Sequence, residues 1–172
     1  MQRQWLRTGL VLFIAMGAGC AKAPQSHADA ARAKDPLGAL PAPAAQSPWP
    51  VMVVTKNASC GCCGAWVERM RAAGFQVEVH DVDNLDPIKT RLGIPAGKGS
   101  CHTAEIGGYF VEGHVPAQDI KRLLAERPNA KGLVLPGMPL GSPGMEVPDG
   151  TVQPYTVELV DPRGETVAFA QH

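Results

Sequence analysis

The chain has 172 residues, which is enough for one domain of ordinary size and too few for two large ones. Its 16 basic and 16 acidic side chains balance to a net charge of zero, which argues against a nucleic-acid-binding protein, because such proteins need a basic surplus. Hydrophobic residues make up 45% of the chain, a composition that allows a packed core and argues against wholesale disorder.

The N-terminal residues have the pattern of a targeting segment. Arg3 and Arg7 precede an apolar run over residues 10–18, which is typical of a signal-peptide core and too short to span a bilayer as a helix. Residues 17–20 resemble a bacterial lipoprotein cleavage box, although Gly17 stands where a large aliphatic residue is usual. We therefore expect a signal peptide over residues 1–19 and export to the periplasm. Cys20 is then either lipidated, which would anchor the chain to the outer membrane, or lost on cleavage.

A linker is predicted over residues 20–49. Residues 21–50 contain six prolines and ten alanines and few charges, a composition that cannot bury a core. The folded domain is therefore expected over residues 50–172.

The domain has the pattern of a mixed α/β fold. In chain order we expect a strand at 51–55, a helix at 60–73, a strand at 75–82, a helix at 84–93, a hairpin at 103–112 and a helix at 116–127. A βαβ unit followed by a ββα unit, with cysteines at the first strand–helix junction, is the thioredoxin-like plan. The Gly- and Pro-rich residues 131–150 predict a long ordered loop, and an extra C-terminal β-hairpin is expected at about 152–172.

Four cysteines in the domain carry most of the chemical signal. Cys60, Cys62 and Cys63 lie within four residues, and Cys101 precedes the predicted hairpin. The C-x-x-C spacing of Cys60 and Cys63 at a helix start is typical of a redox motif, since free N–H groups there stabilise a thiolate. Cys62 does not fit a simple dithiol, because a third thiol would compete for the disulfide.

Three kinds of cysteine site are compatible with this pattern. Structural disulfides suit an exported protein, but one bond would have to close inside a four-residue loop. A single zinc ion usually takes two separated C-x-x-C pairs, whereas the adjacent Cys62 and Cys63 point in different directions. A polynuclear Cu(I) site needs no convergence on one point, because soft thiolates bridge several ions. The pattern favours copper and leaves the other two open.

Other soft or borderline ligands follow the cysteines. His102 adjoins Cys101, and Met138 and Met145 lie in the Gly- and Pro-rich segment, so all three are candidate auxiliary copper ligands. Each has an alternative role, as a hydrogen-bonded histidine or as a methionine that fills a gap in the core. His114 follows a glycine and is interpreted in preference as a turn residue.

Four motifs in the same order resemble the CopG-type proteins, exported proteins of bacterial copper-resistance loci long carried as a domain of unknown function. They are residues 59–63 (SCGCC), 100–104 (SCHTA), 108–117 (GYFVEGHVPA) and the stretch from 137–139 (GMP) to 144–146 (GME). The resemblance spans roughly residues 51–148. It implies a thioredoxin-like fold in which Cys60, Cys62, Cys63 and Cys101 hold a thiolate-bridged cluster of several copper ions.

The expected function is that of a periplasmic copper-binding protein of copper homeostasis, which holds several Cu(I) ions and interconverts Cu(I) and Cu(II) with a copper-handling or redox partner. The first alternative is a thiol–disulfide oxidoreductase that uses Cys60 and Cys63, and the second is a copper metallochaperone. A reductase should act without metal and tolerate loss of Cys62, whereas a copper cluster should not.

Overall fold

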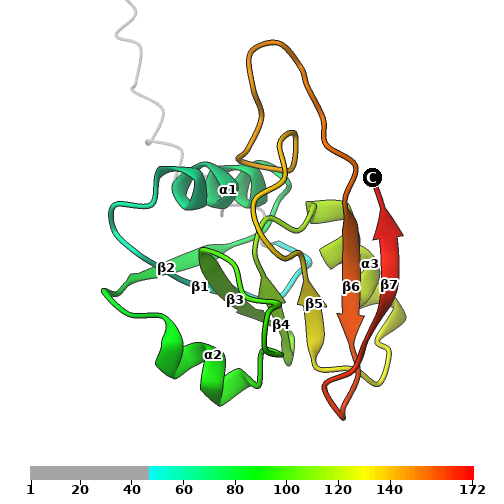
Figure 1. Ribbon diagram of the computed structural model, residues 1–172. Coiled ribbons are helices and arrows are strands. Elements are labelled where there is room, and N and C mark those ends of the chain that lie inside the picture. The colour runs from blue at the N-terminus through cyan, green and yellow to red at the C-terminus, as the bar shows by residue number, and fades with distance from the viewer. Residues whose placement is uncertain (1–46) are drawn as a thin grey trace, which may run out of the picture. The chain divides into compact units, whose positions relative to one another are not determined.

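The computed structural model describes residues 47–172. The predicted signal peptide (1–19), the candidate anchor Cys20 and the predicted linker up to residue 46 lie outside the described residues. The described part is mixed α/β, with one seven-stranded sheet and three helices (Figure 1). None of its helices has both the length and the apolar character needed to cross a membrane.

The sheet joins the two units that the sequence predicts. Its strands are β1 (Met52–Lys56), β2 (Val77–Asp81), β3 (His102–Ile106), β4 (Tyr109–Glu112), β5 (Gly132–Val134), β6 (Thr156–Val160) and β7 (Thr166–Gln171), and the helices are α1 (Gly61–Ala72), α2 (Asp86–Leu92) and α3 (Ala117–Glu126). The strand order is β2-β1-β3-β4-β5-β6-β7. Strand β1 pairs parallel with β2 and antiparallel with β3, and β3 pairs antiparallel with β4. The βαβ and ββα units therefore share one sheet, as predicted, and the thioredoxin-like plan itself stays a prediction.

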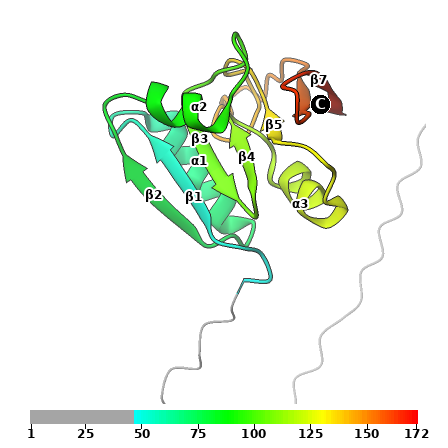
Figure 2. The same ribbon diagram turned by 90° about the horizontal axis from the view of Figure 1, so that it is seen from below.

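The helices cover both faces of the sheet (Figures 1 and 2). Helices α1 and α3 contribute Trp66, Met70, Ile120 and Leu123 to the main hydrophobic core, and all four side chains are fully buried. Trp66 also donates a hydrogen bond from Nε1 to the carbonyl oxygen of Val115, 2.9 Å away. Leu92 and the segment after α2 pack against a smaller cluster on the other face. Burial of these large apolar residues holds α1 and α3 against the sheet.

The predicted loop over 131–150 contains a strand that the sequence did not reveal. Strand β5 pairs parallel with β4 and antiparallel with β6. Three residues are too short for an alternating pattern, and the strand begins with a glycine, which sequence reasoning takes as a turn residue. Gly132 is required by packing, because a Cβ there would lie 2.1 Å from the carbonyl oxygen of Phe110. The predicted C-terminal hairpin thus continues the central sheet.

Two element boundaries differ from the sequence prediction. Asn84 lies before the N-cap of α2, which is Leu85, and its Oδ1 accepts a hydrogen bond from the N–H of Asp86. Packed structure also begins before residue 50, since Ser47 donates a hydrogen bond to the Gly74 carbonyl and Trp49 packs against Phe75.

Candidate metal centre

Two neighbouring chain segments bring the four cysteines together. Cys60 is the N-cap of α1, and its Sγ accepts a hydrogen bond from the N–H of Cys63. Cys101 directly precedes β3, whose first residue lies opposite Lys56 at the end of β1. The four sulfur atoms all lie within 4.8 Å of one another. The sheet thus produces the cluster that the sequence spacing suggested.

Cys60 and Cys63 form a disulfide, and Cys62 and Cys101 are free thiols. The Cys62 sulfur lies 3.6 Å from that of Cys60. Burial, followed by the neighbouring Cys62, raises the pKa of Cys101 to about 11, so this thiol stays protonated at neutral pH unless a cation compensates the thiolate. Four thiolate ligands become available only after the disulfide accepts two electrons.

Two buried histidines face the Cys101 sulfur. His102 Nδ1 lies 3.5 Å from Cys101 Sγ and His114 Nε2 lies 3.1 Å from it, and both side chains are fully buried. Cys101, His102 and His114 form a second group whose ligand atoms lie within 4.8 Å of one another. Cys101 therefore belongs both to the four-cysteine group and to this Cys-His-His group.

The hydrogen bonds of the two rings leave nitrogen atoms available for a metal. His114 Nδ1 lies 2.8 Å from the Pro143 carbonyl oxygen, which can only accept, so Nδ1 carries the proton and the lone pair of Nε2 faces Cys101. The ring nitrogen of His102 that faces Cys101 is Nδ1, and Nε2 of the same ring is buried without a hydrogen-bond partner within residues 47–172.

The sequence predicts a turn role for His114 and does not mark it as a ligand. The residue does lie in a bend, but its ring points inward against Cys101. Gly113 permits this arrangement, because its φ is +79° and a Cβ there would lie 2.5 Å from the Leu135 carbonyl oxygen. The sequence shows the motif Gly113-His114, but the direction of the ring depends on the Pro143 carbonyl oxygen, which comes from another segment.

Burial disfavours the charged form of both imidazoles. Burial, then His114 and Lys89, lowers the pKa of His102 from 6.5 to about 3, and burial also lowers the pKa of His114. Between about pH 6.5 and about pH 3 the unfolded chain binds a proton at residue 102 that the folded chain does not, so the metal-free protein should lose stability as the pH falls through this range. His102 alone should contribute a loss of at most about 1.4 kcal/mol per pH unit.

Urea unfolding at a series of pH values checks this prediction. His102→Gln should flatten the decline, whereas His80→Gln, on the exposed part of β2, should leave it unchanged. An equal decline in the wild type and in His102→Gln would contradict the prediction.

The two candidate methionines occupy different places in the loop over residues 136–150. The Met138 sulfur lies 3.9 Å from the Cys62 sulfur, and its side chain is 49% exposed. Met145 is half-buried and holds the loop through its backbone, which bonds to Gly141 and Ser142. Among residues 47–172 no hydrogen bond joins its sulfur to a cysteine, so its role as a ligand stays a prediction.

The loop over residues 136–150 is fastened directly over the cysteines. Ser100 Oγ donates to the Gly137 carbonyl oxygen at 2.7 Å, and Arg69 forms an ion pair with Glu146 at 2.9 Å. Gly144 lies so close to α1 that a Cβ there would be 2.7 Å from the Trp66 nitrogen and 2.8 Å from the Cys62 carbonyl oxygen. The loop is therefore part of the site and holds His114 and Met138 against it.

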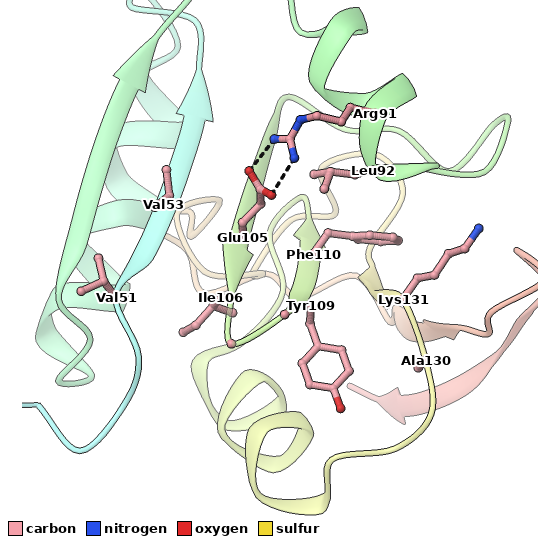
Figure 3. Close-up of a pocket in the computed structure, with 12 residues that line it drawn as sticks. Val51, Val53, Arg91, Leu92, Glu105, Ile106, Tyr109, Phe110, Ala130 and Lys131 are labelled. Atoms are coloured by element: carbon pink, nitrogen blue, oxygen red, sulfur yellow. Dashed lines mark hydrogen bonds and ion pairs between the residues drawn. The ribbon is translucent and has the colours of Figure 1, made fainter.

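A separate open cleft of about 550 Å³ lies at the other end of β3 and β4 (Figure 3). Its lining is both apolar and charged, and two of the lining residues, Arg91 and Glu105, form an ion pair of 2.6 Å. The cleft has no cysteine or histidine in its lining, so it is not part of the cysteine site.

The donor atoms of the site suit copper. The two groups together offer four cysteine sulfurs and two imidazoles, and no carboxylate belongs to either. Thiolates prefer Cu(I), and imidazole also suits copper.

The comparisons with known proteins agree with this chemistry. A family model described as "Protein of unknown function, DUF411" matches residues 98–145. Two solved structures titled "Copper resistance protein copG", Form 2 and Form 1, are 43% and 44% identical to this chain, with TM-scores of 0.68 and 0.67. Each match covers 72% of this chain and 98% of the solved chain. Comparison with proteins of curated function gives no match.

Proposed function

The chain belongs to the CopG-type family of copper resistance proteins, and on this premise we propose that it binds several Cu(I) ions in its cysteine cluster. Cys60, Cys62, Cys63 and Cys101 are the proposed thiolate ligands, with His102, His114, Met138 and Met145 as auxiliary ligands. The observation that carries the proposal is that Cys101 belongs to both ligand groups. A bridging thiolate there would join ions held by sulfur to an ion held by imidazole.

The same site is suited to exchange electrons with copper. Two Cu(I) ions that become Cu(II) release two electrons, and the Cys60–Cys63 bond takes up both electrons as it breaks into two thiolates. In the reverse direction the two thiolates form the bond and reduce two Cu(II) ions. The disulfide and the Cys-His-His group, which offers nitrogen ligands to Cu(II), support this proposal.

We place this activity in the periplasm, with the Ala- and Pro-rich linker and a lipid on Cys20 as the proposed tether to the outer membrane.

Copper loading of the reduced chain tests the proposed function. The protein and its Cys62→Ser variant are reduced, given excess Cu(I) without oxygen, and weighed by native mass spectrometry. We expect more than one tightly held copper ion per wild-type chain and fewer in the variant, since Cys62 cannot then bridge. No retained copper in the wild type would overturn the proposal.

A thiol–disulfide oxidoreductase is the second candidate, and the Cys60–Cys63 bond at the start of α1 favours it. Such an enzyme would reduce a disulfide substrate without metal and would keep its rate in Cys62→Ser.

The exposed Met138 beside Cys62 would favour a metallochaperone, which passes copper to a partner through an accessible ligand. Copper that leaves the protein only when a partner is present would distinguish the metallochaperone from a static cluster.

A further inference from the structure

A charged side chain lies buried next to the segment that leads to Cys101. Glu112, at the end of β4, is fully buried and forms an ion pair with Lys89 of α2. Its Oε2 accepts a hydrogen bond of 2.6 Å from Thr103 Oγ1, and Lys89 also donates to this hydroxyl at 3.1 Å. Burial of a carboxylate costs free energy even when it is paired, so the presence of Glu112 in the core calls for an explanation other than stability.

The carboxylate of Glu112 holds the residue that precedes Cys101. Its Oε1 accepts a hydrogen bond of 2.6 Å from the backbone N–H of Ser100. Cys101 lies between this anchored amide and β3, and residues 93–101 contain no helix or strand. The Ser100 N–H, held by Glu112, therefore anchors the chain directly before Cys101, the cysteine that belongs to both ligand groups.

The rest of the network also surrounds Cys101. Ser100 Oγ holds the loop over residues 136–150 through the Gly137 carbonyl oxygen, and the Gly113 N–H holds the carbonyl oxygen of His102. A Cβ on Gly113 would lie 2.7 Å from Ser100 Cβ, so the turn after Glu112 packs against Ser100. Lys89 of α2, Thr103 of β3 and Glu112 of β4 are therefore linked by these contacts to Ser100, the residue before Cys101.

We propose that Glu112, neutralised by Lys89, is a positioning residue that fixes Cys101 where both ligand groups can share it. Partners behind the ligands orient them, and their loss typically lowers metal affinity by about 10- to 100-fold. The effect on copper rests on the proposed function, whereas the effect on the position of Cys101 does not.

The test uses the whole chain and the Glu112→Gln variant, with one measurement that needs no copper. In the reduced, metal-free protein, hydrogen exchange of the Ser100 amide and alkylation of Cys101 are followed by mass spectrometry and NMR. The wild-type Ser100 amide should be protected, and Glu112→Gln should speed both its exchange and the alkylation of Cys101 by about tenfold or more. Competition with a Cu(I) chelator should show an affinity about 10- to 100-fold lower.

Two variants control for stability and charge. Thr103→Val removes one donor to the same carboxylate but leaves the Ser100 contact, so it should lower the melting temperature without changing the position of Cys101. Glu105→Gln makes the same chemical change in the more exposed pair with Arg91 (Figure 3), and copper affinity should not change. If Glu112→Gln does not fold, Glu112→Asp keeps the charge but shortens the reach to Ser100, and it should show the same losses.

The outcomes separate the two proposals. Rapid exchange of the Ser100 amide in the wild type, or unchanged Cys101 alkylation in the folded Glu112 variants, would overturn the positioning role. Thr103→Val losses equal to those of Glu112→Gln would also overturn it, because stability alone would then explain both. A wild type that binds no copper but shows the expected amide and thiol changes would refute the proposed function and leave the positioning role intact.

Discussion

Replacement of Cys101 by serine should cause the largest loss of copper of any single cysteine change. Cys101 lies within 4.8 Å of the ligand atoms of three other cysteines and of two histidines, whereas Cys62 belongs only to the sulfur group. A hydroxyl is a poor ligand for Cu(I), so both groups lose their shared member in Cys101→Ser. Native mass spectrometry after anaerobic Cu(I) loading should find no retained copper in Cys101→Ser and partial loading in Cys62→Ser.

Circular dichroism of the metal-free variants provides the control, because both should keep the wild-type fold. Cys101 and Cys62 are both only partly buried, and neither takes part in the disulfide. Equal copper retention in Cys101→Ser and Cys62→Ser would show that the two ligand groups do not share an ion through Cys101.

Replacement of Gly144 by alanine should separate the loop over residues 136–150 from α1. Gly144 has φ +84°, and its missing Cβ would meet the backbone of Trp66 and Cys62 at 2.7–2.8 Å, so neither neighbour can yield by a change of rotamer. The left-handed conformation costs about 1–3 kcal/mol in a residue with a side chain, and the overlap adds about 1–3 kcal/mol. We expect a lower free energy of unfolding and weaker copper binding, because this loop holds His114 and Met138.

Gly150→Ala is the matched control for this prediction. Gly150 has φ +74°, close to that of Gly144, but a Cβ there would meet nothing within 4 Å. Urea unfolding measures the loss in free energy of unfolding for each variant. Because only Gly144 closely approaches α1, a larger loss in Gly144→Ala than in Gly150→Ala would come from that contact. If the two variants lose the same stability, the loop does not depend on its close approach to the helix.

The gathering of the cysteines could be predicted from the sequence because its signal is local. Cys60, Cys62 and Cys63 are neighbours in the chain, and a helix with Cys60 as its N-cap gathers them at one end. Cys101 required one further inference, that the segment before β3 lies beside the start of α1, and the antiparallel pairing of β1 with β3 produces this arrangement.

The missed features depend on contacts between distant residues. Nothing near His114 in the sequence indicates whether its ring points to solvent or to Cys101, because the Pro143 carbonyl that orients it comes from another segment. Glu112 looks like an ordinary strand residue until Lys89 and Ser100 are seen beside it. Strand β5 shows no pattern of its own, since its partners β4 and β6 define it.

The position of β5 also explains what the C-terminal hairpin does for the sheet. Strand β5 pairs with β4 on one side and with β6 on the other. Without β6 and β7 the sheet would end in an exposed apolar edge, Gly132–Val134, which could pair with another chain. The Lys98–Glu158 ion pair also ties β6 to the segment that leads to Cys101. The hairpin therefore protects the edge of the sheet and supports the segment on which Cys101 lies.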